Sequence, residues 1–186
     1  MNIFSDKPEK FRGKYRIDSV RLKHWDYSTD AAYFITICTK NREHFFGEIV
    51  GGEMEWSEMG RIVADEWQNT EKIRSNVKID EWVVMPNHFH GIIMIQNPVN
   101  PVETHCNASL PNYVEYKNEF GPQSNNLSAI IRGFKGLTTK NIHIAGFADF
   151  AWQPRFHDRV IRNEGELHRI REYIENNPLM WDRDRN

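Results

Sequence analysis

Apolar and polar residues alternate in some segments of this chain and recur at helical spacing in others. The segment AAYFITICT alternates and is rich in aromatic and β-branched residues, so residues 32–39 are predicted to form a β-strand. The segment GEIVGGEMEW predicts a hairpin that turns at Gly51 and Gly52. Ser57 is a suitable N-cap for EMGRIVADEWQNTEKIR, whose apolar residues recur every three or four positions, and this segment is predicted to be a helix.

The second half of the chain continues this pattern of strands and helices. The segments VKIDEWVVM and HFHGIIMIQ predict two strands joined by the turn PN. Residues 127–141 predict a helix despite two internal glycines, and residues 156–161 predict a short strand. A final helix is predicted between Asn163 as its N-cap and Pro178 as its stop.

The order of these elements predicts the class of fold. Strand, helix, strand, strand, helix and strand, followed by one more helix, is typical of the α+β class. In particular, it indicates a ferredoxin-like (split βαβ) antiparallel sheet with helices on one face plus a C-terminal helix. The 186 residues are predicted to form a single domain. Within it, residues 1–22 form an extended basic arm, and residues 97–126, rich in Pro, Asn and Ser, form a variable loop.

Composition excludes several classes of protein. No segment approaches the roughly 18 consecutive apolar residues that a membrane span requires. The charged start MNIFSDKPEKFRGKYR does not resemble a secretion signal. Cys38 and Cys106 support neither a disulfide framework nor a zinc site of the CxxC kind. These features predict a cytoplasmic protein with no membrane partner.

Charge is unevenly distributed, although the formal net charge is only −2. Residues 43–81 contain ten acidic and four basic residues, whereas residues 132–171 contain eight basic and four acidic residues. The basic C-terminal third can therefore present a face that binds phosphate groups, as nucleic-acid-binding proteins do. A solvated charged face without a partner is the alternative interpretation.

Two imidazoles lie in the otherwise apolar segment WVVMPNHFHGIIMI. His88 and His90 are two positions apart on a predicted strand, so both side chains leave the sheet on the same face. Two ligands of one metal ion would be arranged in this way. A pair of half-buried, hydrogen-bonded histidines without a metal is the alternative.

The final predicted helix adds two polar candidates. Tyr173 and Asn177 are four positions apart and therefore share one face of this helix. Each also has a structural alternative. Tyr173 adjoins an apolar stripe and could pack in the core, whereas Asn177 precedes Pro178 and could be a helix C-cap.

The motif MPNHFH, followed later by WQPRFHDRVIRNEGELHRIREYIENNP, resembles the single-tyrosine HUH transposases, where H is histidine and U a bulky apolar residue. The chain is most similar to the REP-associated tyrosine transposases. The likeness includes FITICTKNREHFFGEI and extends over residues 33–180 apart from the variable loop. It implies that His88 and His90 bind a metal ion, that Tyr173 is the catalytic nucleophile, and that Asn177 completes the metal site.

The resemblance also implies a reaction and a cofactor. Members of this family cut and rejoin single-stranded DNA through a 5′-phosphotyrosine intermediate. The implied function is thus a metal-dependent single-stranded DNA endonuclease and strand transferase that acts at hairpin-flanked sites. Two imidazole nitrogens and one amide oxygen suit Mg²⁺ or Mn²⁺ as the working ion.

A groove for single-stranded DNA needs basic side chains and aromatic platforms. The C-terminal third of the chain supplies both, and the predicted DNA-binding residues are Lys135, Trp152, Arg155, Phe156, Arg159 and Arg162. The alternative for the segment WQPRF is structural. In that case Trp152 lies in the core, and Gln153 and Arg155 hold the final helix in place.

Two other functions compete with the transposase. A domesticated regulator would keep the fold and bind DNA or RNA hairpins without cutting them, but the intact histidines, tyrosine and asparagine argue against this. A metallohydrolase of small phosphoesters would need neither a tyrosine nucleophile nor a basic groove. Assembly stays open, because short-tailed insertion-sequence relatives resemble obligate homodimers with shared sites, whereas REP-associated relatives can act as monomers.

Overall fold

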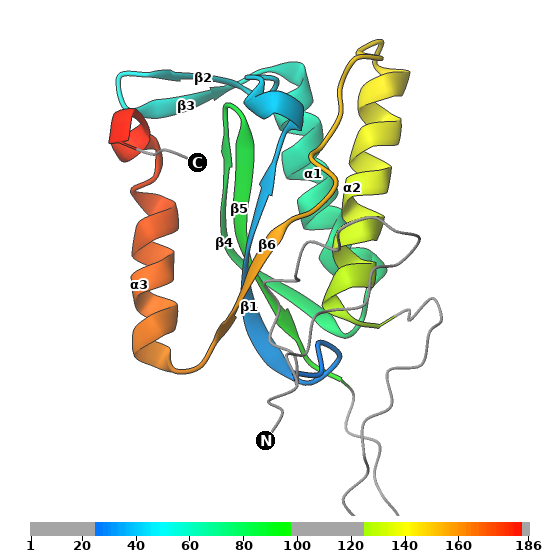
Figure 1. The fold of residues 1–186 in the computed structure, drawn as a ribbon, viewed down its shortest axis with the longest axis vertical. Helices are drawn as coiled ribbons and strands as arrows, with labels where there is room; N and C mark the ends of the chain where they lie inside the picture. Colours follow the sequence, from blue (N-terminus) through cyan, green and yellow to red (C-terminus); the bar gives the residue numbers. More distant parts are fainter. Residues whose placement is uncertain (1–24, 98–124, 184–186) are drawn as a thin grey trace, which may run out of the picture.

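A four-stranded antiparallel sheet forms the centre of the molecule (Figure 1). The computed structural model describes residues 25–97 and 125–183, so the predicted arm and nearly all of the predicted variable loop lie outside the described residues. The strands have the order β4-β5-β1-β6, and each neighbouring pair is antiparallel. This order confirms the predicted α+β, ferredoxin-like sheet. The strands are β1 (Ala31–Cys38), β4 (Val77–Met85), β5 (His88–Ile95) and β6 (His157–Ile161).

Two helices pack on each other and cover one face of this sheet (Figure 1). They are α1 (Glu58–Ile73) and α2 (Leu127–Ile144). Both begin at polar caps. The side chain of Ser57 accepts a hydrogen bond from the backbone N–H of Gly60, and that of Asn126 accepts one from Ala129. Among the described residues, no helix is long and apolar enough to cross a membrane.

Aromatic rings join these two helices to the sheet. Trp67 of α1 lies 4.7 Å from the ring of Phe89 on β5 and 5.2 Å from that of Phe134 on α2. A Cβ atom at Gly91 would lie 2.9 Å from the Trp67 ring, so the strand needs a glycine where the indole approaches it. This close contact places the core between the helical layer and β5.

The final helix, α3 (Glu164–Glu175), covers the opposite face of the sheet (Figure 1). Asn163 caps it as predicted, because its side chain accepts a hydrogen bond from the backbone N–H of Glu166. The helix ends at Glu175, three residues before the predicted stop Pro178, and Pro178 begins a short 3₁₀ helix, η3 (Pro178–Arg183). The apolar contact with the sheet is made by Ile92, Ile161, Leu167, Ile170 and Ile174.

The predicted hairpin between β1 and α1 is confirmed. It consists of β2 (Gly47–Val50) and β3 (Glu53–Trp56), and its turn has positive φ angles of 62° at Gly51 and 86° at Gly52. A Cβ atom on Gly52 would lie 2.8 Å from the side chain of Leu179 in η3. The hairpin turn and the segment that follows α3 therefore lie side by side.

An ion pair holds α3 to the edge strand β4. The Nε and Nη2 atoms of Arg171 donate hydrogen bonds of 2.7 and 2.6 Å to the two carboxylate oxygens of Asp80. These bonds are the main reason that the pKa of Asp80 lies below its usual value. The pair is partly exposed, at 39% for the arginine side chain and 15% for the aspartate. Water therefore screens it, and its contribution to stability is modest.

We expect Asp80→Asn to lower the free energy of unfolding by about 1 kcal/mol at pH 7. Because the pKa of Asp80 is lowered in the folded chain, its contribution is present above its ordinary pKa of about 3.9 and disappears as the pH falls through the lower folded value. Urea unfolding of wild type and variant should therefore converge below about pH 3. Asp65→Asn, an exposed position on α1, is the control. A difference that persists unchanged in acid would contradict the role of the ion pair.

Candidate active site

His88 and His90 project from β5 toward α3. They pair with Cys38 and Thr36 of β1, which lies between β5 and β6 in the sheet. Both side chains are buried, and their rings lie 4.5 Å apart between centroids. The shared face that the two-residue spacing predicted is therefore observed.

A polar neighbour orients each imidazole. Nδ1 of His88 lies 2.8 Å from Oδ1 of Asn87. Since an amide oxygen only accepts hydrogen bonds, Nδ1 donates to it, and Nε2 is the ring nitrogen left for another partner. Nδ1 of His90 lies 2.8 Å from Oγ1 of Thr36, a hydroxyl that can accept the same kind of bond. Both rings can thus present Nε2 as a metal ligand.

Burial keeps His90 uncharged. Desolvation, followed by the neighbouring His88, lowers the pKa of His90 well below its usual value. A neutral imidazole retains the lone pair that a metal ion needs. A neutral His90 fits both interpretations of the sequence, a buried histidine pair and a metal-binding pair. The two interpretations differ only in whether an ion is bound.

Tyr173 lies beside His90. Its hydroxyl is 3.3 Å from Nε2 of His90, the ring centroids are 5.3 Å apart, and its ring meets Phe34 edge-on. The side chain is 42% exposed, unlike the buried apolar stripe of α3. The core alternative does not describe this position, because the residue is exposed while its hydroxyl contacts His90.

Asn177 is buried at the end of α3. The residue is 2% exposed, and no described residue in 25–97 or 125–183 forms a hydrogen bond with its Oδ1. The cap at the end of the helix is Asn176, whose backbone N–H bonds to the carbonyl of Glu172. A buried carbonyl without a partner costs roughly 1–3 kcal/mol, so a ligand for this oxygen would be stabilising.

The residues present fit a divalent metal ion. Among the described residues, no group of three or more His, Cys, Asp and Glu side chains could hold one, so a metal centre here must use another kind of donor. The amide oxygen of Asn177 is such a donor, although Asn177 lies beyond the C-cap Asn176 and so outside the helical face that carries Tyr173. The family resemblance implies that it acts together with His88 and His90, and two nitrogens and one oxygen are donors that Mg²⁺ or Mn²⁺ accepts.

Trp181 is a site neighbour that the sequence did not reveal. Its indole stacks on His88 with centroids 6.1 Å apart and planes at 23°, and it meets the ring of His44 edge-on at 5.5 Å. Trp181 is brought there by η3, and His44 precedes β2. Neither position carries a sequence pattern that predicts these contacts. Among the orienting residues, only Asn87 is adjacent in sequence to a histidine that it contacts.

The predicted DNA-binding residues divide into two groups. Trp152 is 9% exposed and packs against Phe46, Phe134 and Phe150, so the core alternative applies to it and it offers no ring to a base. Phe156 is half-buried against the same core. The arginines are exposed at positions 155, 159 and 162.

Lys135 is partly buried and serves the segment before β6. Its Nζ donates hydrogen bonds to the backbone carbonyls of Gln153, at 2.5 Å, and Arg155, at 3.3 Å. Burial lowers its pKa to about 8. This lysine therefore holds the segment that leads into β6 against α2.

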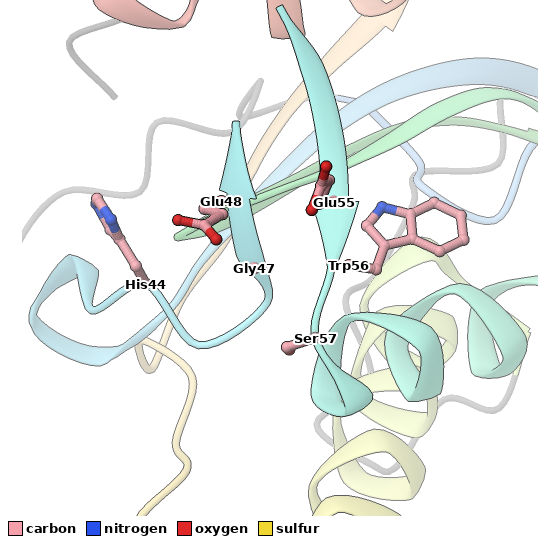
Figure 2. Close-up of a pocket in the computed structure, with 6 residues that line it drawn as sticks. All are labelled: His44, Gly47, Glu48, Glu55, Trp56 and Ser57. Carbon is pink, nitrogen blue, oxygen red and sulfur yellow. The ribbon is translucent and has the colours of Figure 1, made fainter. Parts of the chain in front are cut away.

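A surface hollow of about 490 Å³ lies beside the hairpin and is lined in part by His44, Glu48, Glu55 and Trp56 (Figure 2). Glu48 and Glu55 are cross-strand partners on β2 and β3, so two carboxylates face this hollow from neighbouring strands. Paired negative charges repel phosphate groups. This hollow is therefore unsuited to a DNA backbone.

Comparisons with known proteins give one relative by sequence and similar folds among solved structures. No protein-family model matches the chain. A protein of Haemophilus influenzae (strain ATCC 51907 / DSM 11121 / KW20 / Rd), described as uncharacterised, is 39% identical over 170 residues, which cover 89% of this chain and 90% of that protein.

Solved structures supply the comparison of folds. The structure of a REP-associated tyrosine transposase bound to a REP hairpin aligns with a TM-score of 0.55 and 19% identity, over 89% of this chain and 74% of the other. A candidate transposase from Deinococcus radiodurans R1 aligns with a TM-score of 0.41 and 15% identity, over 85% of this chain and 97% of the other, which is too weak to support an inference. The chain belongs to the same protein family as the Haemophilus influenzae protein, and it has the fold of the REP-associated tyrosine transposase.

Proposed function

We propose that this protein is a metal-dependent single-stranded DNA endonuclease and strand transferase, a transposase of the single-tyrosine kind. The observation that carries the proposal is the approach of the Tyr173 hydroxyl to within 3.3 Å of Nε2 of His90. The exposed phenol lies beside one of two adjacent buried imidazoles, and the buried amide oxygen of Asn177 lacks a hydrogen-bond partner among the described residues. This arrangement supports a tyrosine nucleophile next to a metal-binding set.

Tyr173 would perform the covalent step. Its phenol oxygen attacks the scissile phosphorus, the P–O3′ bond breaks, and the departing 3′ oxygen takes up a proton while the phenol loses one. The 5′-phosphate is then held as a phosphotyrosine, which retains the bond energy for rejoining. A phenol has an ordinary pKa near 10, so its reaction at neutral pH needs a site that stabilises negative charge.

His88, His90 and Asn177 would hold Mg²⁺ or Mn²⁺ next to this phenol. The bound ion would supply neutralisation of the charge on the scissile phosphate. Asn87 and Thr36 keep the two rings in orientation, and the Trp181 indole covers His88. These contacts limit the freedom of the ligands before an ion arrives.

The substrate is proposed to be single-stranded or hairpin DNA. The solved structure that shares the fold is bound to a REP hairpin, which supports a hairpin partner for this chain. The exposed arginines at positions 155, 159 and 162 support binding to a phosphate backbone. Trp152 is not part of this proposal, because it is buried.

Within one chain the Tyr173 hydroxyl already reaches His90, which supports a site that a single chain can form. α3 packs on the sheet of its own chain through apolar contacts and the Arg171–Asp80 pair. A silent hairpin-binding regulator would need none of the orienting contacts around His88 and His90. Their presence favours the enzyme over the regulator.

Tyr173→Phe should abolish formation of a covalent protein–DNA adduct while leaving DNA and metal binding intact. Phenylalanine keeps the ring contacts with Phe34 and His90 but removes the attacking oxygen, so the change in stability should stay within about 1 kcal/mol. Denaturing gels with labelled single-stranded DNA from the flanks of the gene measure the adduct. Tyr33→Phe, a buried position on the other face of the sheet, is the matched control and should still form it.

Peptide mapping of the wild-type adduct gives a second readout. A 5′-phosphate attached to a peptide that contains Tyr173 is expected. Adduct formation by Tyr173→Phe at the wild-type rate would show that another residue, or a water molecule, is the nucleophile.

His88→Ala, His90→Ala and Asn177→Ala should each lower the affinity for Mn²⁺ at least about tenfold, as substitutions at metal sites typically do. Calorimetric titration of Mn²⁺ measures the affinity, and thermal melting shows whether each variant folds. His44→Ala removes an imidazole outside the ligand set and is the control. If all variants bind Mn²⁺ like wild type, the histidines are structural and the metal proposal is wrong.

A further inference from the structure

A second surface hollow, of about 440 Å³, lies where β6 leads into α3. This corner of the sheet is far along the helix from η3 (Figure 1). Arg159 comes from β6, Arg162 from the connection and Arg169 from the second turn of α3, so three arginines from consecutive elements line one cavity. The other lining residues are Tyr27, Asp158, Val160, Asn163 and Glu166.

One carboxylate in this hollow is already engaged. Glu166 is 7% exposed, its Oε2 accepts a hydrogen bond from the backbone N–H of Arg162, and its Oε1 lies 2.5 Å from Nη2 of Arg159. The bond from Arg162 is the main reason that the pKa of Glu166 is lowered. Glu166 therefore anchors the corner and partly neutralises Arg159.

Arg162 and Arg169 are the arginines of the hollow that could bind an anion. Arg162 and Arg169 are exposed, and in the described part of the chain no salt bridge is found for either guanidinium. Asp158 is half-buried and is the other acid in the lining. The lining thus contains three arginines and two carboxylates, and one of these carboxylates, Glu166, is buried. The net charge exposed in the hollow is therefore positive.

Tyr27 adds an aromatic surface to the same hollow. Its ring is half-buried and stacks on Tyr33 with centroids 5.7 Å apart and planes at 26°. Stacking on a buried ring holds the outer ring in one orientation. A basic hollow with a fixed aromatic wall has the two features by which proteins hold single-stranded nucleic acid.

Helix α3 connects this hollow to the nucleophile. Arg169 and Tyr173 are four residues apart and share one face of the helix, about 6 Å apart along its axis. Neighbouring phosphates of an extended single strand are separated by a similar distance. A strand with its scissile phosphate at Tyr173 would therefore reach the hollow within one or two nucleotides.

We propose that the hollow is a subsite for a backbone phosphate of the DNA strand, held by Arg162 and Arg169, with the adjoining base against Tyr27. This inference rests on the proposed function and adds the path that the strand follows along α3. It assigns Arg169 and Tyr27 to substrate binding and gives Glu166 the role of positioning the arginines.

Binding to single-stranded DNA tests the subsite. The measurement is fluorescence anisotropy with labelled DNA from the flanks of the gene. Arg162→Gln combined with Arg169→Gln should weaken binding about tenfold or more, because the variant loses charged hydrogen bonds to the phosphate, which contribute more to binding than neutral ones. The dependence of affinity on salt should also flatten, by roughly 0.7 in logarithmic slope for each phosphate that the variant no longer neutralises. The matched control, Arg132→Gln combined with Lys140→Gln, removes two exposed charges from α2 and should bind like wild type.

A chemical probe locates the phosphate. Once adduct formation has identified the cleavage site, methylphosphonate is introduced at one phosphate at a time. Neutralising the phosphate one or two nucleotides from that site should weaken binding to wild type but should not weaken binding to the double variant any further. Additive effects at every position would overturn the subsite, because the arginines and that phosphate would then act independently.

Two further measurements separate the possible failures. Tyr27→Phe should bind like wild type and Tyr27→Ala more weakly, and equal binding by both would remove Tyr27 from the subsite.

Inorganic phosphate at millimolar concentration should displace the labelled DNA less strongly than unlabelled DNA does. Equally strong displacement would show that the hollow is a site for small anions and would overturn the strand path. If wild type forms the Tyr173 adduct and the double variant binds DNA equally well, only the subsite fails. If wild type neither binds nor cuts single-stranded DNA, the proposed function itself fails.

Discussion

The packing of α3 against the sheet determines whether the site exists. The sheet presents one face to α1 and α2 and leaves Ile92 and Ile161 on the other, where the apolar stripe of α3 covers them. This seam places Tyr173 beside His90 and delivers Asn177 into the interior. Hydrophobic burial has no directional preference and does not by itself fix the position of α3 on the sheet. The ion pair between Arg171 and Asp80 of β4 fixes that position more closely.

The site combines groups that are uncharged when buried. Two imidazoles and an amide carbonyl avoid the desolvation cost that buried carboxylates would bring. In the proposed function, the positive charge would be supplied by the metal ion that they hold. The exposed arginines lie elsewhere, around the start of α3 and before β6. Under the proposed function, catalysis and DNA binding are therefore separated along α3, with Tyr173 toward its C-terminal end and the cationic side chains around its N-terminal half.

The sequence predicted the strands, helices and caps because periodicity and capping depend on neighbouring residues. It also predicted that His88 and His90 share a face, which follows from strand geometry alone. It could not identify Thr36 as the partner of His90, since that contact depends on the register between β1 and β5. Trp152 was misleading because a tryptophan beside basic residues has the same sequence pattern whether it packs in the core or faces solvent. Trp181 reaches His88 only through the turn after α3.

The contact between Tyr173 and His90 joins residues 83 positions apart. Chains are synthesised from the N-terminus, so β5 and its imidazoles emerge well before the helix that bears the phenol. During that interval the face with Phe34 and Ile92 has no cover from α3. The docking of α3 hides this apolar face, on which a nascent chain would aggregate, and the same event brings the Tyr173 hydroxyl to His90. Under the proposed function, a chain whose α3 has not docked could therefore not cut DNA.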